Sequence, residues 1–545
     1  MQYFQRKNQN RVKKEHPLQK QPVQRNHAYR LAVIVPAMNE EDTLGAVLDE
    51  INRLMPDELI VVVNGSKDQT AAVASGKGAK VIQFHYPLGN DVGRAIGAEA
   101  ANADIYLFTD ADIVIQAEQY IPFIVAIENG EDLSLNSIDW ITHFDKADTI
   151  SAGRYFLNHI QGRKDLRAEN LLTIPHTMSH HLIQEIGVSA LVNPMLANSM
   201  ALQKTKNVTV PFTIDVLKMN KPRKNHVAKG SGQLSTAMQR MQGDMLEALH
   251  YVIHHGNRDL VEIQVVWDEQ ELEQCREAWC KDQPKKPVSF VVYIDDHYDT
   301  SLVTTIAQLQ HNETVEVIPV VSGECSVLCW QLEQMKQPYL RLQQIEKMGP
   351  AFKVGQRFSR GDYCLFHHGC IPLTVYHIAQ FVEQAMIHPD ALIYNNQEQL
   401  FTSLEDMSVF FSGQQLVTML NLTASAHLSS LLLPPFLLPQ MKAQQVGIPE
   451  RLQIDLLLED VSMFAGPEVN VQPFLHMFED ELIRELLLGF RYLFTKKTVR
   501  GGFSDEGRRR ELLQNVAIEE SRLKVDSRKL SLSYVYTGTS QHADT

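Results

Sequence analysis

The stretch Leu31–Asp42 reads LAVIVPAMNEED and decides the fold class. Its first five residues are apolar and mostly β-branched, and a proline ends them, which is typical of a buried parallel strand. Two similar runs follow, Leu59–Val63 (LIVVV) and Ile105–Phe108 (IYLF), with helical patterns between them. Strands that alternate with helices predict an α/β fold with a mostly parallel central sheet flanked by helices.

The composition excludes several classes of protein. The chain has 545 residues, of which 44% are hydrophobic and 21% are charged, so it is long enough for two large domains and is not globally disordered. Its formal net charge of −14 argues against a general nucleic-acid binder. Six cysteines without paired motifs, and no signal sequence, predict reduced thiols and a cytoplasmic location.

The first 30 residues differ from the rest. They hold eight Lys or Arg residues and a single acid, and they contain few large apolar side chains. We expect residues 1–30 to form a disordered basic arm. Such an arm either makes a weak peripheral contact with an anionic membrane surface or polymer, or is a solvated tail.

The second half of the chain repeats patterns of the first half. Leu31–Thr43 aligns with Val288–Thr300, 257 positions later, and Asp104–Asp112 aligns with Asp362–Cys370, 258 positions later. A near-constant offset predicts an internal duplication. The predicted organisation is a basic arm (1–30), an N-terminal module (31–267), a linker (268–287), a degenerate C-terminal module (288–515) and a polar tail (516–545).

A polar cluster follows each of the three predicted strands named above. The clusters are Asn39-Glu40, Asn64-Gly65-Ser66 and Asp110-Ala111-Asp112. Because parallel sheets bind ligands at the carboxyl ends of their strands, we expect these clusters to share one site. Asp110 and Asp112 are suited to hold Mg²⁺ or Mn²⁺, and the alternative is a solvated turn.

The ordered motifs resemble those of family 2 glycosyltransferases. They are Val33–Glu41 (VIVPAMNEE), Val62–Thr70 (VVNGSKDQT), Gly93–Gly97 (GRAIG) and Thr109–Asp112 (TDAD). The resemblance implies a GT-A fold, a nucleotide-diphosphosugar donor and a divalent metal.

The resemblance also implies a role for each matching residue. Pro36, Asn39 and Glu40 would border the nucleoside, and Asn64, Gly65 and Ser66 would lie beside the base. Arg94 would reach toward the phosphates or the sugar, Asp110 would contact the ribose or sugar, and Asp112 would hold the metal. Many family members have two acids where this chain has Val63 and Asn64, which leaves UDP-sugar and GDP-sugar donors both open.

Family members usually invert the anomeric centre with an acid that precedes a late helix. Asp244, before a helical pattern that continues to His255, matches that place and is the predicted general base. An N-cap for the same helix is the alternative, and Glu247 is the second choice as base. His176 is a predicted acceptor contact, since family members often place acceptor residues in that region.

The C-terminal module has lost the two acids. His368 and Cys370 stand where Asp110 and Asp112 stand in the first copy, which predicts a copy without donor-metal binding. With His367 they could instead hold a softer metal such as zinc. The run Arg508-Arg509-Arg510 reads as solvated surface.

These features predict a metal-dependent glycosyltransferase that acts on an unidentified acceptor. A nucleotidyltransferase is a weaker alternative, because the first strand is not followed by a glycine-rich basic signature. A non-catalytic scaffold that binds nucleotide-sugar or glycan is the third hypothesis.

Overall fold

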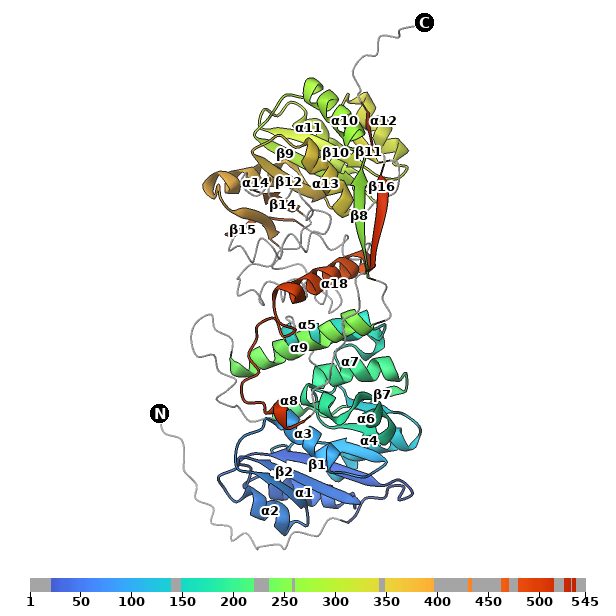
Figure 1. Ribbon diagram of the computed structural model, residues 1–545, viewed down its shortest axis with the longest axis vertical. Coiled ribbons are helices and arrows are strands. Elements are labelled where there is room, and N and C mark those ends of the chain that lie inside the picture. Colours follow the sequence, from blue (N-terminus) through green and yellow to red (C-terminus); the bar gives the residue numbers. More distant parts are fainter. Residues whose placement is uncertain are drawn as a thin grey trace, which may run out of the picture.

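We describe a computed structural model of the chain. The described residues are 21–138, 149–219, 235–256, 260–342, 348–396, 430–433, 462–469, 479–513, 524–530 and 532–535. They form two α/β modules at opposite ends of an elongated molecule (Figure 1). No helix within these ranges is both long and apolar enough to cross a membrane.

The N-terminal module is built on a seven-stranded sheet. From one edge to the other, its strands are β3 (Lys80–Phe84), β2 (Glu58–Asn64), β1 (Leu31–Ala37), β4 (Ile105–Phe108), β6 (His176–Ser179), β5 (Leu133–Asn136) and β7 (Val208–Phe212). Strands β3, β2, β1 and β4 are parallel neighbours, and only β6 runs antiparallel to both of its neighbours. The predicted mostly parallel sheet is confirmed.

Helices cover both faces of this sheet. They are α1 (Leu44–Asn52), α2 (Thr70–Gly76), α3 (Asn90–Glu99), α4 (Ala117–Glu128), α5 (Thr149–Ile160), α6 (His180–Ile186), α7 (Pro194–Lys204), α8 (Val216–Met219) and α9 (Thr236–His255). Alternate residues of β1 face opposite cores: Ile34 packs in the core with α3 and α9, and Val33 packs in the core with α1 and α4. The close approach of α3 requires Gly97, because a Cβ there would lie 2.5 Å from Ile34 Cγ2.

The C-terminal module has an eight-stranded sheet. In order, its strands are β15 (Met463–Glu468), β13 (Leu392–Asn396), β14 (Ser430–Leu433), β12 (Tyr363–His368), β9 (Val288–Ile294), β10 (Val315–Val321), β11 (Tyr339–Leu342) and β17 (Leu532–Val535). Its helices include α10 (Glu269–Asp282), α11 (Ser301–Leu309), α12 (Ser326–Gln334), α13 (Met348–Phe358) and α14 (Val375–Ile387).

The two sheets share one topology. The order β11-β10-β9-β12-β14-β13-β15 repeats β3-β2-β1-β4-β6-β5-β7, and every pair of neighbours keeps its relative direction. Gly355 of α13 lies against Val291 of β9 as Gly97 of α3 lies against Ile34 of β1. Strand β17 is the addition, paired antiparallel with β11.

Three predicted segments differ from the structure. The predicted linker contains α10, whose Trp279 is fully buried in the C-terminal core. Residues 524–535, predicted as polar tail, include β16 (Lys524–Leu530), which pairs in parallel with β8 (Val261–Trp267), and β17. In the predicted arm, the Arg25 side chain is 1% exposed and donates to Asp57 and to backbone carbonyls, and Val23 packs against the module core. These two residues anchor residues 21–30, which are otherwise exposed; residues 1–20 lie outside the described ranges.

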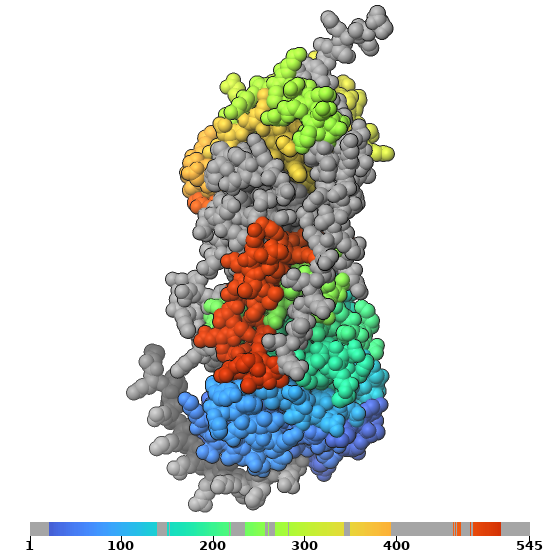
Figure 2. Space-filling model, in the orientation of Figure 1, coloured from blue at the N-terminus to red at the C-terminus, as the bar shows by residue number. Residues whose placement is uncertain are grey.

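Helix α18 (Glu479–Lys496) joins the modules in an unexpected way. The sequence places it in the C-terminal module, but Leu487, Phe490 and Leu493 are buried in the N-terminal core. It contacts α9, and the two helices lie between the sheets in Figure 1. The residues that follow, 497–513, which we call the clasp, continue onto the N-terminal module as the lower part of the red band in Figure 2.

Candidate functional site

The loops after β1 and β2 are joined by hydrogen bonds. Asn39 has a left-handed φ of 57°, accepts a hydrogen bond from the Lys67 N–H at 2.8 Å, and donates its own N–H to Ser66 Oγ at 3.0 Å. The Glu40 N–H donates to Thr70 Oγ1 at 2.9 Å. These contacts bring two of the three predicted polar clusters together at the carboxyl edge of the sheet.

Asn64 presents a buried donor at the same edge. Its side chain is 1% exposed, and Nδ2 has no hydrogen-bond partner among the described residues. A Cβ at Gly93 of α3 would lie 3.0 Å from Pro36 Cβ and 3.7 Å from Asn64 Nδ2, so glycine keeps α3 close to both side chains. A buried amide without a partner costs free energy, and a polar ligand group would remove that cost. Position 65 requires glycine, because its φ is 76° and because a Cβ there would lie 2.5 Å from the backbone nitrogen of Pro87.

Arg94 of α3 connects to the third cluster. It donates to Asp91 Oδ1 at 2.7 Å and to Asp110 Oδ1 at 2.5 Å, and its side chain is 8% exposed. Burial opposes the charged guanidinium, but Asp110 and Asp91 raise the pKa of Arg94 above its ordinary value. Arg94 is therefore a fixed cation that orients the first acid of the Asp-x-Asp pair.

The Asp-x-Asp pair fits a divalent metal. Asp110 lies two residues after the end of the buried strand β4 and is partly exposed, with one oxygen held by Arg94. Asp112 lies two residues further on and is 7% exposed. No group of three or more His, Cys, Asp or Glu side chains in the described ranges could enclose a metal by itself. Two carboxylates are nevertheless the usual protein share for Mg²⁺, which keeps waters and binds substrate phosphates.

His176 lies beside this pair on the neighbouring strand. It is paired in register with Phe108, and the two rings stack at 5.1 Å. Its Nδ1 lies 3.0 Å from the Thr173 carbonyl oxygen, which fits a neutral ring that donates there. Burial, and then the charge of Arg94, lower the pKa of His176 to about 3. The ring is therefore a buried neutral group on β6, beside the strand that leads to Asp110.

Asp244 is placed differently from the prediction. Helix α9 begins at Thr236 with Ser235 as its N-cap, so Asp244 lies inside the helix, and both the position before the helix and the alternative N-cap role are wrong. Its side chain is 1% exposed. Arg508 donates to both carboxylate oxygens, at 2.5 and 2.7 Å, and Arg500 donates to Oδ1 at 2.8 Å.

The second-choice base is engaged as well. Glu247 accepts hydrogen bonds from Arg500 at 3.0 Å, from Arg510 at 2.8 Å and from Asn193 at 3.1 Å. A general base needs an oxygen that an acceptor hydroxyl can reach. In this arrangement the carboxylates of Asp244 and Glu247 serve first as partners of the clasp.

The clasp corrects one prediction and supplies residues that the sequence reasoning missed. Arg508 is 4% exposed and Arg510 is 20% exposed, so only Arg509, at 46%, matches the predicted solvated surface. Arg508 also donates to Asp91 Oδ2 at 2.6 Å. The local spacing of Asp505 and Arg508 is compatible with an exposed ion pair. It gave no signal for the contacts with Asp244 and Asp91, because those partners are more than 250 positions away. By contrast, the ion pair between Asp91 and Arg94 could have been predicted, because the two residues are three positions apart on one helix.

The equivalent place in the C-terminal module is closed. His368 is 1% exposed and packs edge-to-face on Tyr293, and His367 Nε2 lies 2.9 Å from the Ile371 carbonyl oxygen. Burial lowers the pKa of His368 to about 3 and raises that of the Cys370 thiol. The alternative of a zinc site formed by His367, His368 and Cys370 is not supported, since the described residues contain no such ligand group.

Comparisons with known proteins match the N-terminal module. Residues 32–180 match the model of the family described as glycosyl transferase family 2. Protein RfbJ of Shigella flexneri is 34% identical over 87 residues, which are 16% of this chain and 67% of RfbJ. The chain belongs to glycosyl transferase family 2.

Other relatives are similar over the same part of the chain. Glucosyl-3-phosphoglycerate synthase of Mycolicibacterium paratuberculosis is 34% identical over 105 residues, which are 17% of this chain and 32% of that protein. The chain thus spans about a third of the length of this curated relative. The crystal structure of the Mycobacterium tuberculosis enzyme of that name with phosphoglyceric acid aligns at 17% identity, with a TM-score of 0.31, over 40% of this chain and 80% of that one.

Proposed function

We propose that the N-terminal module transfers a sugar from a nucleotide-diphosphosugar to an acceptor hydroxyl or phosphate. The observation that carries this proposal is the arrangement at the carboxyl edge of the sheet. There Asp110 and Asp112 follow β4, Arg94 fixes Asp110, and the unpartnered Asn64 amide lies on the other side of β1. Membership in family 2 supports the same reading.

In this proposal, one group of residues contacts the donor nucleoside and another holds the metal. Pro36, Asn39, Glu40, Asn64, Gly65 and Ser66 would border the nucleoside, with the Asn64 amide as a donor to its base. Asp112, with Asp110, would hold Mn²⁺ or Mg²⁺. The metal, when bound, would neutralise charge on the leaving nucleoside diphosphate.

Neutral His176 would contact the acceptor. Its buried ring cannot supply a positive charge near neutral pH, so it would act as a hydrogen-bond partner or as packing. Asp244 was predicted as the base, and its contacts with Arg508 and Arg500 favour a role as an anchor for the clasp instead. The inverting outcome remains a prediction from the family resemblance.

We also propose that the C-terminal module is a duplicated copy that no longer binds a donor metal. The shared strand order supports this, as do equivalent contacts in the two copies. In the first copy, Asn39 Oδ1 accepts a hydrogen bond from the Lys67 N–H, and in the second copy Asp296 Oδ1 accepts one from the Cys325 N–H. Asp296 lies 257 positions after Asn39, and Cys325 lies 258 positions after Lys67. Buried His368 and Cys370 replace the two acids.

A thermal-shift screen tests the donor proposal. Purified full-length protein would be heated with UDP-, GDP- and dTDP-sugars, each with and without Mn²⁺ or Mg²⁺, and 3-phosphoglycerate would head the acceptor panel because of the named relative. A ligand at 100 times its Kd adds about 2.7 kcal/mol of stability, which is enough to detect. One nucleotide-sugar should stabilise the wild type only with metal.

Two other results would redirect the assignment. Binding without turnover across a broad acceptor panel would favour the scaffold hypothesis. Release of pyrophosphate from a nucleoside triphosphate would favour a nucleotidyltransferase. No shift with any nucleotide-sugar would contradict the donor site itself.

A further inference from the structure

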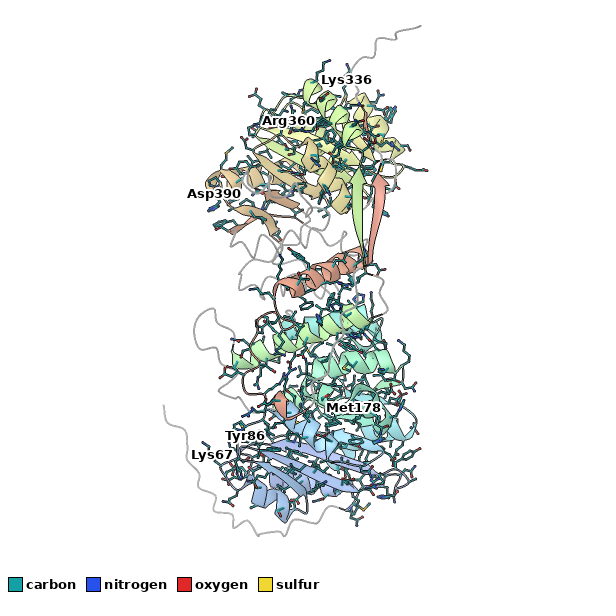
Figure 3. The ribbon with its side chains drawn as sticks, in the orientation of Figure 1. Lys67, Tyr86, Met178, Lys336, Arg360 and Asp390 are labelled. Carbon is teal, nitrogen blue, oxygen red and sulfur yellow. The ribbon has the colours of Figure 1, made fainter. Side chains whose placement is uncertain are left out.

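The clasp docks on the N-terminal module through backbone as well as side chains. The Arg509 N–H donates to the Leu88 carbonyl at 3.1 Å, and the Arg509 guanidinium lies over the Tyr86 ring at 4.9 Å. Figure 3 labels Tyr86 close to the 3-10 helix η6 (Arg510–Leu512) at the end of the clasp. A Cβ at Gly89 would lie 3.1 Å from both Arg508 Cγ and the Gly507 carbonyl oxygen, so the fit is close.

Arg508 is the centre of this contact. Its buried guanidinium bridges Asp91, at the start of α3, and Asp244, inside α9. Two carboxylates enclosed together repel each other and need a cation between them. A planar guanidinium meets both at once, which a lysine ammonium does less well.

Asp91 connects Arg508 to the Asp-x-Asp pair through Arg94. Its other oxygen accepts from Arg94 at 2.7 Å, and Arg94 in turn holds Asp110 at 2.5 Å. Acids and arginines therefore alternate from Asp244 through Arg508, Asp91 and Arg94 to Asp110. Such outer partners fix the direction of a metal-binding carboxylate.

We propose that Arg508 is a positioning residue for the donor site of the N-terminal module. By holding Asp91 it aims Arg94 at Asp110, so the C-terminal segment adds support to a site whose ionic pairs otherwise lie within the N-terminal module. This inference rests on the proposed function. It also gives the C-terminal segment an indirect part in the chemistry, through Asp91 and Arg94.

Arg508→Ala is the principal variant. Arg509→Ala is its matched control, because it keeps the backbone hydrogen bond to Leu88 and removes only an exposed side chain that contacts Tyr86 and Glu511 and is not part of the ionic series from Asp244 to Asp110. Arg508→Lys keeps the charge and guards against a variant that fails to fold, which circular dichroism would reveal. For Arg508→Ala we expect at least a tenfold rise in the Mn²⁺ concentration that gives half-maximal binding of the nucleoside diphosphate found in the screen. Arg508→Lys should fall between the wild type and Arg508→Ala, and Arg509→Ala should match the wild type.

A readout without metal or donor separates positioning from loss of binding. Hydrogen–deuterium exchange of the free protein should rise in residues 89–97 and 105–112 for Arg508→Ala, and it should not rise for Arg509→Ala. A double-mutant cycle with Asp91→Asn then tests the route. If Arg508 acts through Asp91, the two losses of nucleotide affinity should be less than multiplicative.

Several outcomes would overturn the proposal. Multiplicative losses would show that Arg508 does not act through Asp91, and unchanged affinity would show that it does not position the site. Higher activity in Arg508→Ala would identify the clasp as an inhibitory plug. If the wild type binds no nucleotide at all, the proposed function itself fails, and the exchange experiment still decides whether Arg508 orders residues 89–97.

Discussion

At the scale of single residues, the site depends on ionic groups that compensate each other below the surface. Burial alone would raise the pKa of Asp91, but Arg508 and Arg94 hold that pKa below its ordinary value. For Asp244, burial is the larger effect and raises the pKa, although Arg508 and Arg500 oppose the shift. Removing one member of such a set leaves an uncompensated charge, so single substitutions here should be costly.

His176 gives a prediction about pH. Its pKa is about 3 in the folded chain and about 6.5 when unfolded, so the unfolded chain binds the extra proton between these values. The stability that this group contributes is complete above about pH 6.5 and is lost as the pH falls toward 3. Between pH 7.5 and pH 5, the free energy of unfolding should fall in the wild type by up to about 2 kcal/mol more than in His176→Gln. Urea titrations at the two pH values would measure this difference. Equal losses in both proteins would show that His176 is not held neutral.

At the scale of elements, α3 is the part that brings the site together. Its glycines allow it to lie against β1, and its first two turns carry Asp91 and Arg94. Gly97→Ala should lower the free energy of unfolding by about 1–3 kcal/mol, because the new methyl group overlaps Ile34. Thermal unfolding would measure this. Gly76→Ala, where nothing lies within 4 Å of the added Cβ, is the control, and an equal effect at both positions would contradict the packing.

Helix α18 gives a second prediction at this scale. Leu487 is 1% exposed in the N-terminal core, so Leu487→Ala should cost about 2–5 kcal/mol of unfolding free energy. Hydrogen exchange should also become faster in α9, which α18 contacts. Leu512→Ala, at a position 39% exposed, should change neither quantity. Protection of α9 that stays at the wild-type level in Leu487→Ala would exclude this packing.

The features that could be predicted are encoded in adjacent residues, and those that could not depend on contacts between residues far apart in the sequence. Strands β1, β2 and β4 and the acids after β4 were readable, because each is a run of apolar residues followed by its own polar end. The role of α18 was not readable, because an apolar helix face does not reveal which core it joins. Arg508 was predicted to be surface charge because nothing near it in the sequence indicates its buried partners. Asp91 and Asp244 lie 417 and 264 positions away.

At the scale of the whole molecule, the chain crosses between its modules more than once. Strand β8 leads from the N-terminal module to the C-terminal one, and β16 runs parallel to it (Figure 1). Helix α18 and the clasp return to the N-terminal module before β16 and β17. The modules are therefore interdependent and are not two units on a free linker.

Truncation tests this interdependence. A chain that ends at residue 478 loses α18 and the clasp, so its N-terminal module should unfold at a lower temperature and bind nucleotide weakly. A chain that ends at residue 513 keeps both and should retain nucleotide binding while its C-terminal sheet loses β17. Calorimetry and equilibrium titration would measure the two effects. Equal binding by both truncated chains would contradict a contribution from the clasp.

The central claim is a metal-dependent donor site on the N-terminal module. Its most direct test is calorimetric titration of UDP and GDP in the presence and absence of Mn²⁺, with wild type, Asp112→Asn and Cys370→Ala. The last variant changes the equivalent position of the C-terminal module. We expect one nucleotide to bind the wild type and Cys370→Ala with Mn²⁺, and its affinity to fall at least tenfold in Asp112→Asn. Equal affinity in all three proteins, or binding that ignores Mn²⁺, would contradict the assignment.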